Sequence, residues 1–197
     1  MKRLAAKGIV YDPNDRNSVP DEELRAFTDV IVEEYFKRTR EALREFDPGL
    51  LYLGCRFAGA AKPWVIGPCA KYSDVVSYNI YSAGLGKWKL PQDIDAPVLI
   101  GEFHFGAHDR GLFGSGLVNM GNQEGRAEAI KKYVVSGLNN PQIVGVHWHQ
   151  FSDQATSGRF DGEYFQVGWT DICDRPYPET VKALRELGEI LYTTRAK

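Results

Sequence analysis

One carboxylate in this sequence stands where an apolar segment ends, and it is the residue best placed for chemistry. Residues 97–106 read as a buried strand that carries Glu102 and then stops at Gly106. An ionised carboxylate beside an apolar run is costly to bury unless it is hydrogen-bonded or functional. Because catalytic groups of parallel α/β barrels lie at the C-terminal ends of strands, Glu102 is the first candidate for a catalytic residue. The competing interpretation is a glutamate that only forms a salt bridge at a strand end.

Polar side chains at the ends of the neighbouring strands extend this candidate into a site. Side chains alternate along a strand, so if Glu102 points into a barrel, then Val98, Ile100 and His104 should point the same way. In the last strand the alternation predicts that Val144, Val146 and Trp148 point inward. The predicted mouth of the barrel consists of Arg56, Asn79, Tyr81, Glu102, His104, Trp148 and Gln150.

This set of residue types is typical of a carbohydrate site. Trp148 would stack on the face of a sugar, although a tryptophan at this place can equally be a core residue. Tyr81 could hold the Glu102 carboxylate ionised for nucleophilic attack. In the loop that follows the last strand, Asp153, Asp161 and Glu163 could contact a substrate or only cap the loop.

Other chemistries are poorly supported. The sequence has four histidines, but no carboxylate–histidine spacing favours a metal site, and we predict neither metal nor cofactor. No G-x-S-x-G motif exists for a serine nucleophile, and the three cysteines are scattered. No G-x-G-x-x-G motif opens a helix after a strand, which disfavours a dinucleotide-binding fold.

The elements that must position these residues follow from periodicity and from Pro and Gly breakers. Helices are predicted at 21–46, 63–72, 123–138 and 178–192. Strands are predicted at 50–57, 74–81, 97–103 and 143–150. Residues 1–20 read as an irregular lead-in, and residues 21–197 as a partial (β/α)₈ catalytic domain.

Alternation of strands and helices predicts an α/β fold with a parallel sheet. Four strands amount to about half of a (β/α)₈ barrel, which usually takes roughly 250 residues. The long loops, 82–96, 104–122 and 149–176, all follow strands, as they do on the active-site face of such barrels. An open half-barrel would leave unpaired sheet edges, so self-association is a further expectation.

Composition excludes some classes of function. The net charge of −2 provides no basic surface for nucleic acid. No run of 18 apolar residues exists, so we predict no membrane-spanning segment. The first residues lack the apolar core of a signal peptide.

Several motifs, taken together and in order, resemble the C-terminal half of the β-agarases of glycoside hydrolase family 50. They are 51–57 (LYLGCRF), 74–81 (DVVSYNIY), 101–106 (GEFHFG), 145–153 (GVHWHQFSD) and 158–163 (GRFDGE). The resemblance implies strands five to eight of a retaining (β/α)₈ glycosidase, with Glu102 as the nucleophile. It also implies that Tyr81 contacts the nucleophile, that Trp148 is the platform under the sugar, and that the substrate is agarose or its oligosaccharides.

One departure from the family pattern matters. Retaining glycosidases need a second carboxyl group as acid/base. The resemblance implies that in this clan of (β/α)₈ glycosidases it is a Glu after the fourth strand, usually preceded by Asn. The sequence contains no Asn-Glu pair, so the acid/base is expected upstream of this chain, in a longer parent. Two alternatives stay open, an inactive carbohydrate-binding half-barrel and a related β-galactosidase-type enzyme. The family implies an extracellular or periplasmic location for the parent.

Overall fold

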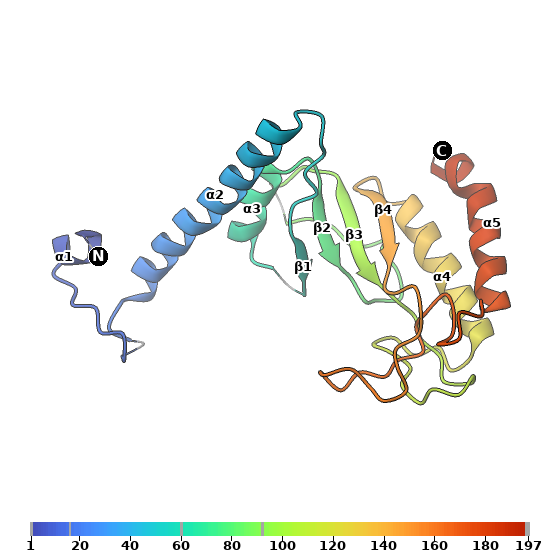
Figure 1. Cartoon of the computed structure of the whole chain (residues 1–197). Coiled ribbons are helices and arrows are strands. Elements are labelled where there is room, and N and C mark those ends of the chain that lie inside the picture. The colour runs from blue at the N-terminus through green and yellow to red at the C-terminus, as the bar shows by residue number, and fades with distance from the viewer. Residues whose placement is uncertain (1, 16, 60, 92, 196–197) are drawn as a thin grey trace.

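The protein is built on one parallel four-stranded sheet. The computed structural model describes residues 2–15, 17–59, 61–91 and 93–195. The strands are ordered as in the chain: β1 (Arg56–Ala58), β2 (Val76–Asn79), β3 (Val98–Phe103) and β4 (Ile143–Trp148). The helices are α1 (Lys2–Ala6), α2 (Asp21–Phe46), α3 (Pro63–Tyr72), α4 (Gln123–Leu138) and α5 (Pro178–Arg195). Figure 1 shows α2 and α3 beside β1, and α4 and α5 beside β4. The predicted four parallel strands with flanking helices are confirmed.

The elements lie where they were predicted, but β2 and β4 are shorter than the predicted 74–81 and 143–150, and α5 extends beyond 192 to Arg195. Two further differences concern the beginning of the chain and the first strand. Residues 1–20 are not wholly irregular, because Lys2–Ala6 is a short helix. The first strand is only Arg56–Ala58, whereas a strand over 50–57 was predicted. Before Arg56, the chain is held by Asp74 instead. The Asp74 carboxylate accepts the Tyr52 N–H at 2.8 Å, and the Asp74 N–H donates to the Tyr52 carbonyl at 2.8 Å.

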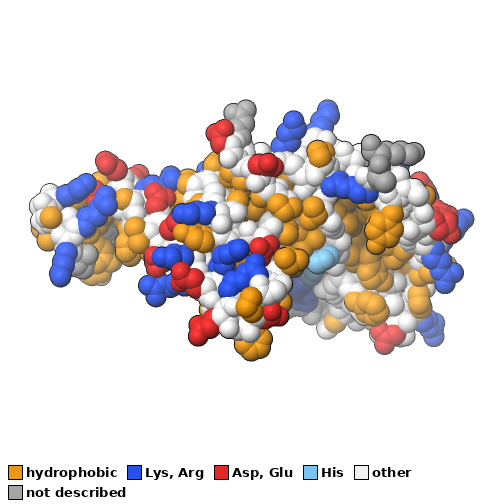
Figure 2. All heavy atoms as spheres, turned by 90° about the horizontal axis from the view of Figure 1, so that it is seen from above, with side chains coloured by type: hydrophobic (Ala, Val, Ile, Leu, Met, Phe, Trp, Pro, Cys, Tyr) orange, Lys and Arg blue, Asp and Glu red, His pale blue; other side chains and the backbone are white. Residues whose placement is uncertain are grey.

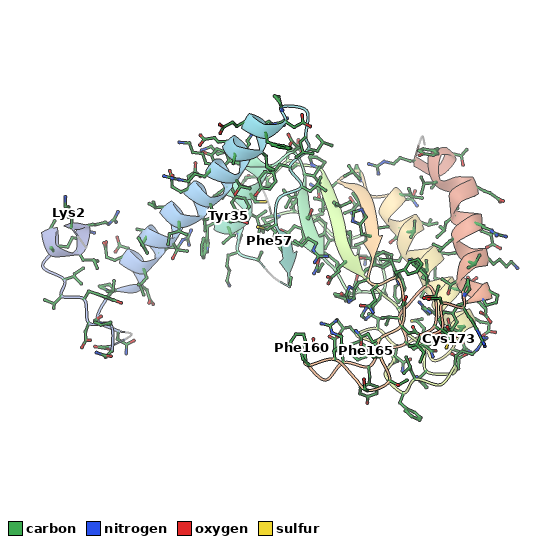
Figure 3. The ribbon with its side chains drawn as sticks, in the orientation of Figure 1. Lys2, Tyr35, Phe57, Phe160, Phe165 and Cys173 are labelled. Atoms are coloured by element: carbon green, nitrogen blue, oxygen red, sulfur yellow. The ribbon has the colours of Figure 1, made fainter. Side chains whose placement is uncertain are left out.

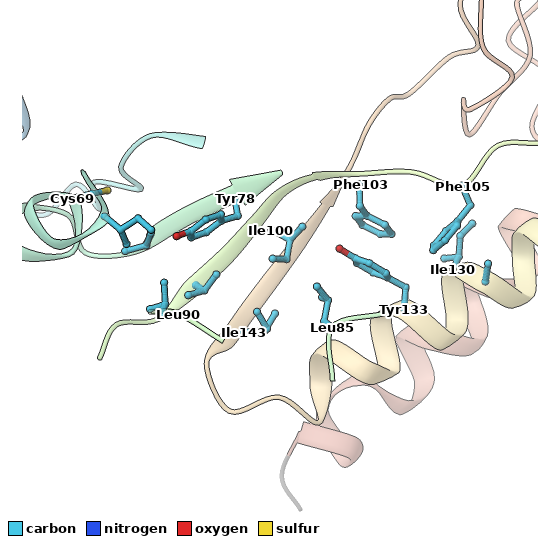
Figure 4. Packing of buried hydrophobic residues seen from close by; sticks show 14 of the residues in the cluster. Cys69, Tyr78, Leu85, Leu90, Ile100, Phe103, Phe105, Ile130, Tyr133 and Ile143 are labelled. Atoms are coloured by element: carbon cyan, nitrogen blue, oxygen red, sulfur yellow. The ribbon is translucent and has the colours of Figure 1, made fainter. Parts of the chain in front are cut away.

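The hydrophobic core lies between the sheet and its helices. Phe103 stacks on Tyr133 of α4 with ring centroids 4.2 Å apart, and the Tyr133 hydroxyl donates to the Ile80 carbonyl at 2.8 Å. Figure 4 shows Ile100, Phe103 and Ile143 reaching from the strands toward Tyr133 and Leu85. Ile100 and Val98 are fully buried in this layer, so the prediction that they share the inward side with Glu102 is wrong.

A bulge in β3 explains why the simple alternation fails. Tyr78 pairs with Ile100, but the next residue, Asn79, pairs with Glu102, so β3 carries one extra residue, Gly101. A β-bulge of this kind re-aims the side chains that follow it. A Cβ at position 101 would lie 2.5 Å from the Arg56 side chain, so any other residue at this position would displace Arg56. The bulge brings Glu102 to the side of the sheet that carries Arg56 and Asn79.

Large apolar side chains stay uncovered on the long helix α2. Leu24, Phe27 and Ile31, at helical spacing, are all exposed, and Phe36 is the hydrophobic residue that the helix buries.

Figure 2, viewed from above, shows hydrophobic side chains around a hollow in which a histidine is visible. Among the described residues, no helix has the length and apolar character needed to cross a bilayer.

One buried arginine ties the long loops to the sheet. Arg126 of α4 is fully buried and donates to the carbonyls of Phe105 (2.9 Å), Val167 (2.9 Å) and Gly168 (2.5 Å). It also donates to the side chain of Gln123 at 3.0 Å. Burial lowers the pKa of Arg126 to about 10, which leaves the guanidinium charged at neutral pH. These contacts fix the loops that follow β3 and β4.

Candidate active site

Glu102 lies at the C-terminal end of β3, and each of the other three strands directs a polar group at its carboxylate. Asn79 of β2 donates to Oε2 at 2.7 Å, and the Tyr81 hydroxyl donates to the same oxygen at 2.8 Å. The guanidinium of Arg56, on β1, lies 3.1 Å from Oε1. His149, directly after β4, places Nδ1 3.7 Å from Oε1. Hydrogen bonds to a carboxylate from donors fixed on strands hold it in one orientation.

Tyr81 is a donor that stays protonated. Burial raises the pKa of Tyr81 above its usual value, and the neighbouring Glu102 carboxylate raises it further. The Tyr81 ring also packs edge-on against the His104 imidazole, with centroids 4.7 Å apart. The hydroxyl is therefore both fixed in place and available as a hydrogen-bond donor at neutral pH.

A cavity of about 380 Å³ opens beside this carboxylate. It is lined by Ala58, Gly59, Asn79, Tyr81, Glu102, His104, Leu117, His149, Arg159 and Glu163. A hollow of similar volume between α4, β4 and α5 is lined mostly by aliphatic side chains. A binding site is recognised by polar groups that converge in a concave surface, so the cavity beside Glu102 is the candidate active site.

His104 supports the wall of the cavity from within. It is 2% exposed, and its Nε2 accepts the backbone N–H of Leu117 at 2.8 Å. Gly116 has φ +73°, and a Cβ there would lie 2.6 Å from Nε2, so the close approach needs glycine. Burial lowers the pKa of His104 from 6.5 to about 4, with His149 adding to the effect, so the imidazole is neutral near pH 7.

This buried histidine predicts a loss of stability in acid. Between pH 6.5 and about 4, the unfolded chain takes up a proton at His104 that the folded chain does not. The free energy of unfolding should therefore fall as the pH falls through this window, by about 3 kcal/mol between pH 7 and pH 4. Urea unfolding of the wild type and of His104→Gln, at both pH values, measures the contribution, since Gln can still accept the Leu117 N–H. Equal pH dependence in the two proteins would contradict it.

Trp148 does not line this cavity. Its indole N–H donates to the Val167 carbonyl at 2.8 Å, and its ring stacks on Trp169 with centroids 4.3 Å apart. Phe103 meets it edge-on at 5.1 Å, on the helix side of the sheet. The prediction that Trp148 points inward is wrong, and so is the one for Val146, which pairs with the core residue Ile100. His149 is the β4-side residue that faces Glu102.

Two other predicted site residues also lie outside the cavity. The Gln150 side chain donates to the Ser152 carbonyl at 2.8 Å. Asp153 is buried in the loop, where it accepts the Gly168 N–H at 2.7 Å and the Tyr177 hydroxyl at 2.5 Å. Burial raises the pKa of Asp153. The structure therefore brings together Arg56, Asn79, Tyr81, Glu102 and His104, and separates them from Trp148, Gln150 and Asp153.

The polar cavity residues His149, Arg159 and Glu163 were not assigned to the site from the sequence. His149 was missed because the bulge changes the faces of the strands, and Gly101 was the available signal, since an isolated glycine in a strand often marks a bulge. No sequence pattern points to Arg159, and for Glu163 the sequence is equally consistent with capping of the loop and with substrate contact. No strand pattern places them, because both belong to the loop after β4. Within the described ranges, no group of three or more His, Cys, Asp or Glu side chains could hold a metal ion.

A four-stranded parallel sheet with a carboxylate at the C-terminal end of a strand is what about half of a (β/α)₈ barrel would provide. No protein-family model matches the sequence. The chain is 39% identical over 174 residues to β-agarase B of Vibrio sp. (strain JT0107). The matched segment covers 86% of this chain and 18% of that protein. An exo-β-agarase structure is 42% identical, with a TM-score of 0.80 over 85% of this chain and 23% of that one. The structure of an agarase, AgWH50C, is 36% identical, with a TM-score of 0.84 over 100% of this chain and 30% of that one.

These comparisons confirm the resemblance that the motifs indicated. The chain belongs with the β-agarases of glycoside hydrolase family 50 and corresponds to one segment of their length. It spans about a fifth of the length of the curated relatives it matches.

Proposed function

We propose that this chain is the part of a β-agarase-type glycoside hydrolase that carries the nucleophile, Glu102. Residues 21–197 would form part of a retaining (β/α)₈ catalytic domain acting on β-1,4 bonds of agarose or its oligosaccharides. The observation that carries the proposal is the Glu102 carboxylate, held at a strand end by Asn79 and Tyr81 and faced by Arg56. A nucleophilic carboxylate needs such fixed, electrostatically favourable surroundings.

The two oxygens of the carboxylate have different surroundings, which suits attack by one of them. Oε2 accepts both short hydrogen bonds, whereas Oε1 has longer contacts, with Arg56 and His149. Oε1 is thus the oxygen freer to bond the anomeric carbon of the sugar while Oε2 stays anchored. The bond to the leaving oxygen breaks as the glycosyl–Glu102 ester forms, and water later hydrolyses that ester.

The acid/base is the second group that the reaction needs. Its carboxyl should lie roughly 5–5.5 Å from the nucleophile in a retaining enzyme. Glu163 is the other carboxylate among the cavity-lining residues, but its Oε2 accepts from Gln154 at 2.7 Å and lies 3.3 Å from Arg159. Since Glu163 is engaged within its own loop, we infer that the acid/base comes from the part of a longer enzyme that precedes the matched segment.

Release of reducing sugar from agarose, neo-agaro-oligosaccharides and lactose-type substrates tests the proposed substrate class. The proposal predicts product from agarose-type substrates in preference to lactose-type ones when an acid/base is supplied by a longer enzyme containing this chain. Preference for lactose-type substrates would instead support a β-galactosidase. Binding of agaro-oligosaccharide without any hydrolysis would support a carbohydrate-binding role.

Replacing Tyr81 tests how the nucleophile is held. Tyr81→Phe removes the 2.8 Å hydrogen bond to Glu102 and keeps the ring packed against His104. A hydrogen bond to a charged group is worth roughly 1.5–3 kcal/mol, so kcat should fall about 10- to 100-fold. Steady-state kinetics of a longer β-agarase in which this chain replaces the matching segment, with the unfolding midpoint as a control for folding, measures the effect. Unchanged kcat would show that Asn79 alone is enough to hold the carboxylate.

A further inference from the structure

The loop between β4 and α5 presents an aromatic ring fully to solvent. Phe160 is 99% exposed, more than any other large hydrophobic side chain of the described residues. Figure 3 shows it at the tip of this loop, on the side to which the strands point with their C-terminal ends. The residues on both sides of it, 157–159 and 161–163, are polar, charged or glycine. An isolated ring among polar groups is unlike a protein–protein interface, which buries a contiguous patch.

The tip of the loop is held by its own hydrogen bonds. The Arg159 N–H donates to the Glu163 carbonyl at 2.7 Å, and the Gly162 N–H donates to the Arg159 carbonyl at 3.0 Å. The Arg159 guanidinium bonds the Asp161 carboxylate at 2.7 Å. At the base of the loop, Gln154 accepts the Phe165 N–H at 2.7 Å. These hydrogen bonds hold the backbone around Phe160 in place, while the Phe160 ring itself stays exposed to solvent.

The same short segment connects the ring to the catalytic cavity. Arg159 and Glu163, on either side of Phe160 in the sequence, both line the cavity that contains Glu102. The guanidinium carbon of Arg159 lies 5.9 Å from the centroid of the Phe160 ring. In the sequence, the ring is thus adjacent to a residue of the cavity wall, Arg159.

We propose that Phe160 is a stacking platform for a sugar ring of the galactan chain, at least two rings away from the sugar attacked by Glu102. This inference rests on the proposed function and adds a substrate contact to it. Pyranose rings have an apolar face that an aromatic ring can cover, while Arg159 and Glu163 would meet the hydroxyl groups at the edge. The occupant is thus a sugar beyond the attacked one, so only substrates longer than a disaccharide should reach it.

Binding of agaro-oligosaccharides to the 197-residue chain tests this proposal. Titration calorimetry compares the wild type with Phe160→Ala, Phe160→Trp and Phe46→Ala. Phe46 is a matched control, because it is 89% exposed and ends α2 at the opposite end of the sheet. We expect Phe160→Ala to weaken binding of a hexasaccharide about tenfold, the order expected for losing the partial burial of one phenylalanine. Disaccharide affinity should not change, and Phe46→Ala should bind as the wild type does.

A spectroscopic readout separates contact with sugar from a structural role of the ring. Phe160→Trp should retain hexasaccharide binding, and its fluorescence should change on binding relative to that of the wild type. Wild-type binding by Phe160→Ala would overturn the platform and leave the proposed function standing. If the wild type bound no agaro-oligosaccharide, the proposed substrate class would be wrong, and the platform would fall with it.

Discussion

Glu102→Gln is expected to lower turnover at least about 10⁴-fold, the scale on which loss of a covalent nucleophile lowers kcat in other enzymes. The amide keeps the size of the side chain and can still accept the hydrogen bonds of Asn79 and Tyr81. It is a far weaker nucleophile, so no glycosyl ester would form. The measurement is kcat on an agaro-oligosaccharide, in a longer β-agarase in which this chain replaces the matching segment.

Glu163→Gln is the matched control for that experiment. Glu163 lines the same cavity, but its carboxylate is engaged by Gln154 and Arg159. Its loss should affect substrate binding more than chemistry, so kcat should change less than about tenfold. Equal losses of kcat in the two variants would contradict the assignment of the nucleophile to Glu102. So would normal turnover by Glu102→Gln.

Arg126→Ala is expected to destabilise the protein by about 3–5 kcal/mol, because each buried acceptor that it leaves without a donor costs roughly 1–3 kcal/mol. The substitution would leave the carbonyls of Phe105, Val167 and Gly168 without their donor in the interior. It would also remove the cation that lies over the rings of Trp148 and Tyr177. Because these carbonyls belong to the loops after β3 and β4, the walls of the cavity should loosen as well.

Urea unfolding measures the effect of Arg126→Ala on the free energy of unfolding. Two further variants serve as controls. Arg185 is exposed on α5, so Arg185→Ala should change the free energy of unfolding by less than about 0.5 kcal/mol. Arg126→Lys keeps the charge but not the fork of five donors, so it should fall between the wild type and Arg126→Ala. If Arg126→Ala were as stable as Arg185→Ala, the buried network would not hold the loops.

Local signals were enough to predict most of the elements. The helix Asp21–Phe46 has its predicted bounds, because Pro20 and Asp47-Pro48-Gly49 mark its ends clearly. Alternation along β2 predicted the face of Asn79, and the charge of Arg56 at the end of its strand favoured the same face for Arg56, as the register of the two strands shows. The predicted alternation of β3 is wrong after Gly101, because this extra residue in the strand moves the side chains that follow it to the opposite face of the sheet. A period-two pattern carries no information about such a shift.

The loops were the part of the site that the sequence could not reveal. Asp153 and Glu163 are both acidic residues in one polar loop, yet Asp153 is bonded to Tyr177 in the interior while Glu163 lines the cavity. Their different positions depend on long-range contacts, including those of Arg126 with Val167 and Gly168. No local pattern in the sequence encodes these contacts, so the roles of the two residues could not be separated beforehand.

The central claim is that Glu102 forms a covalent bond to a sugar, and a burst experiment with an activated substrate tests it most directly. A dinitrophenyl β-galactoside has a leaving group that departs without protonation, so the first step does not need the acid/base. The wild-type chain should release about one equivalent of dinitrophenolate rapidly, and mass spectrometry should find one galactosyl group on the peptide that contains Glu102. Glu102→Gln should give neither signal. A galactosyl group on another residue, or an equal burst from Glu102→Gln, would contradict the account.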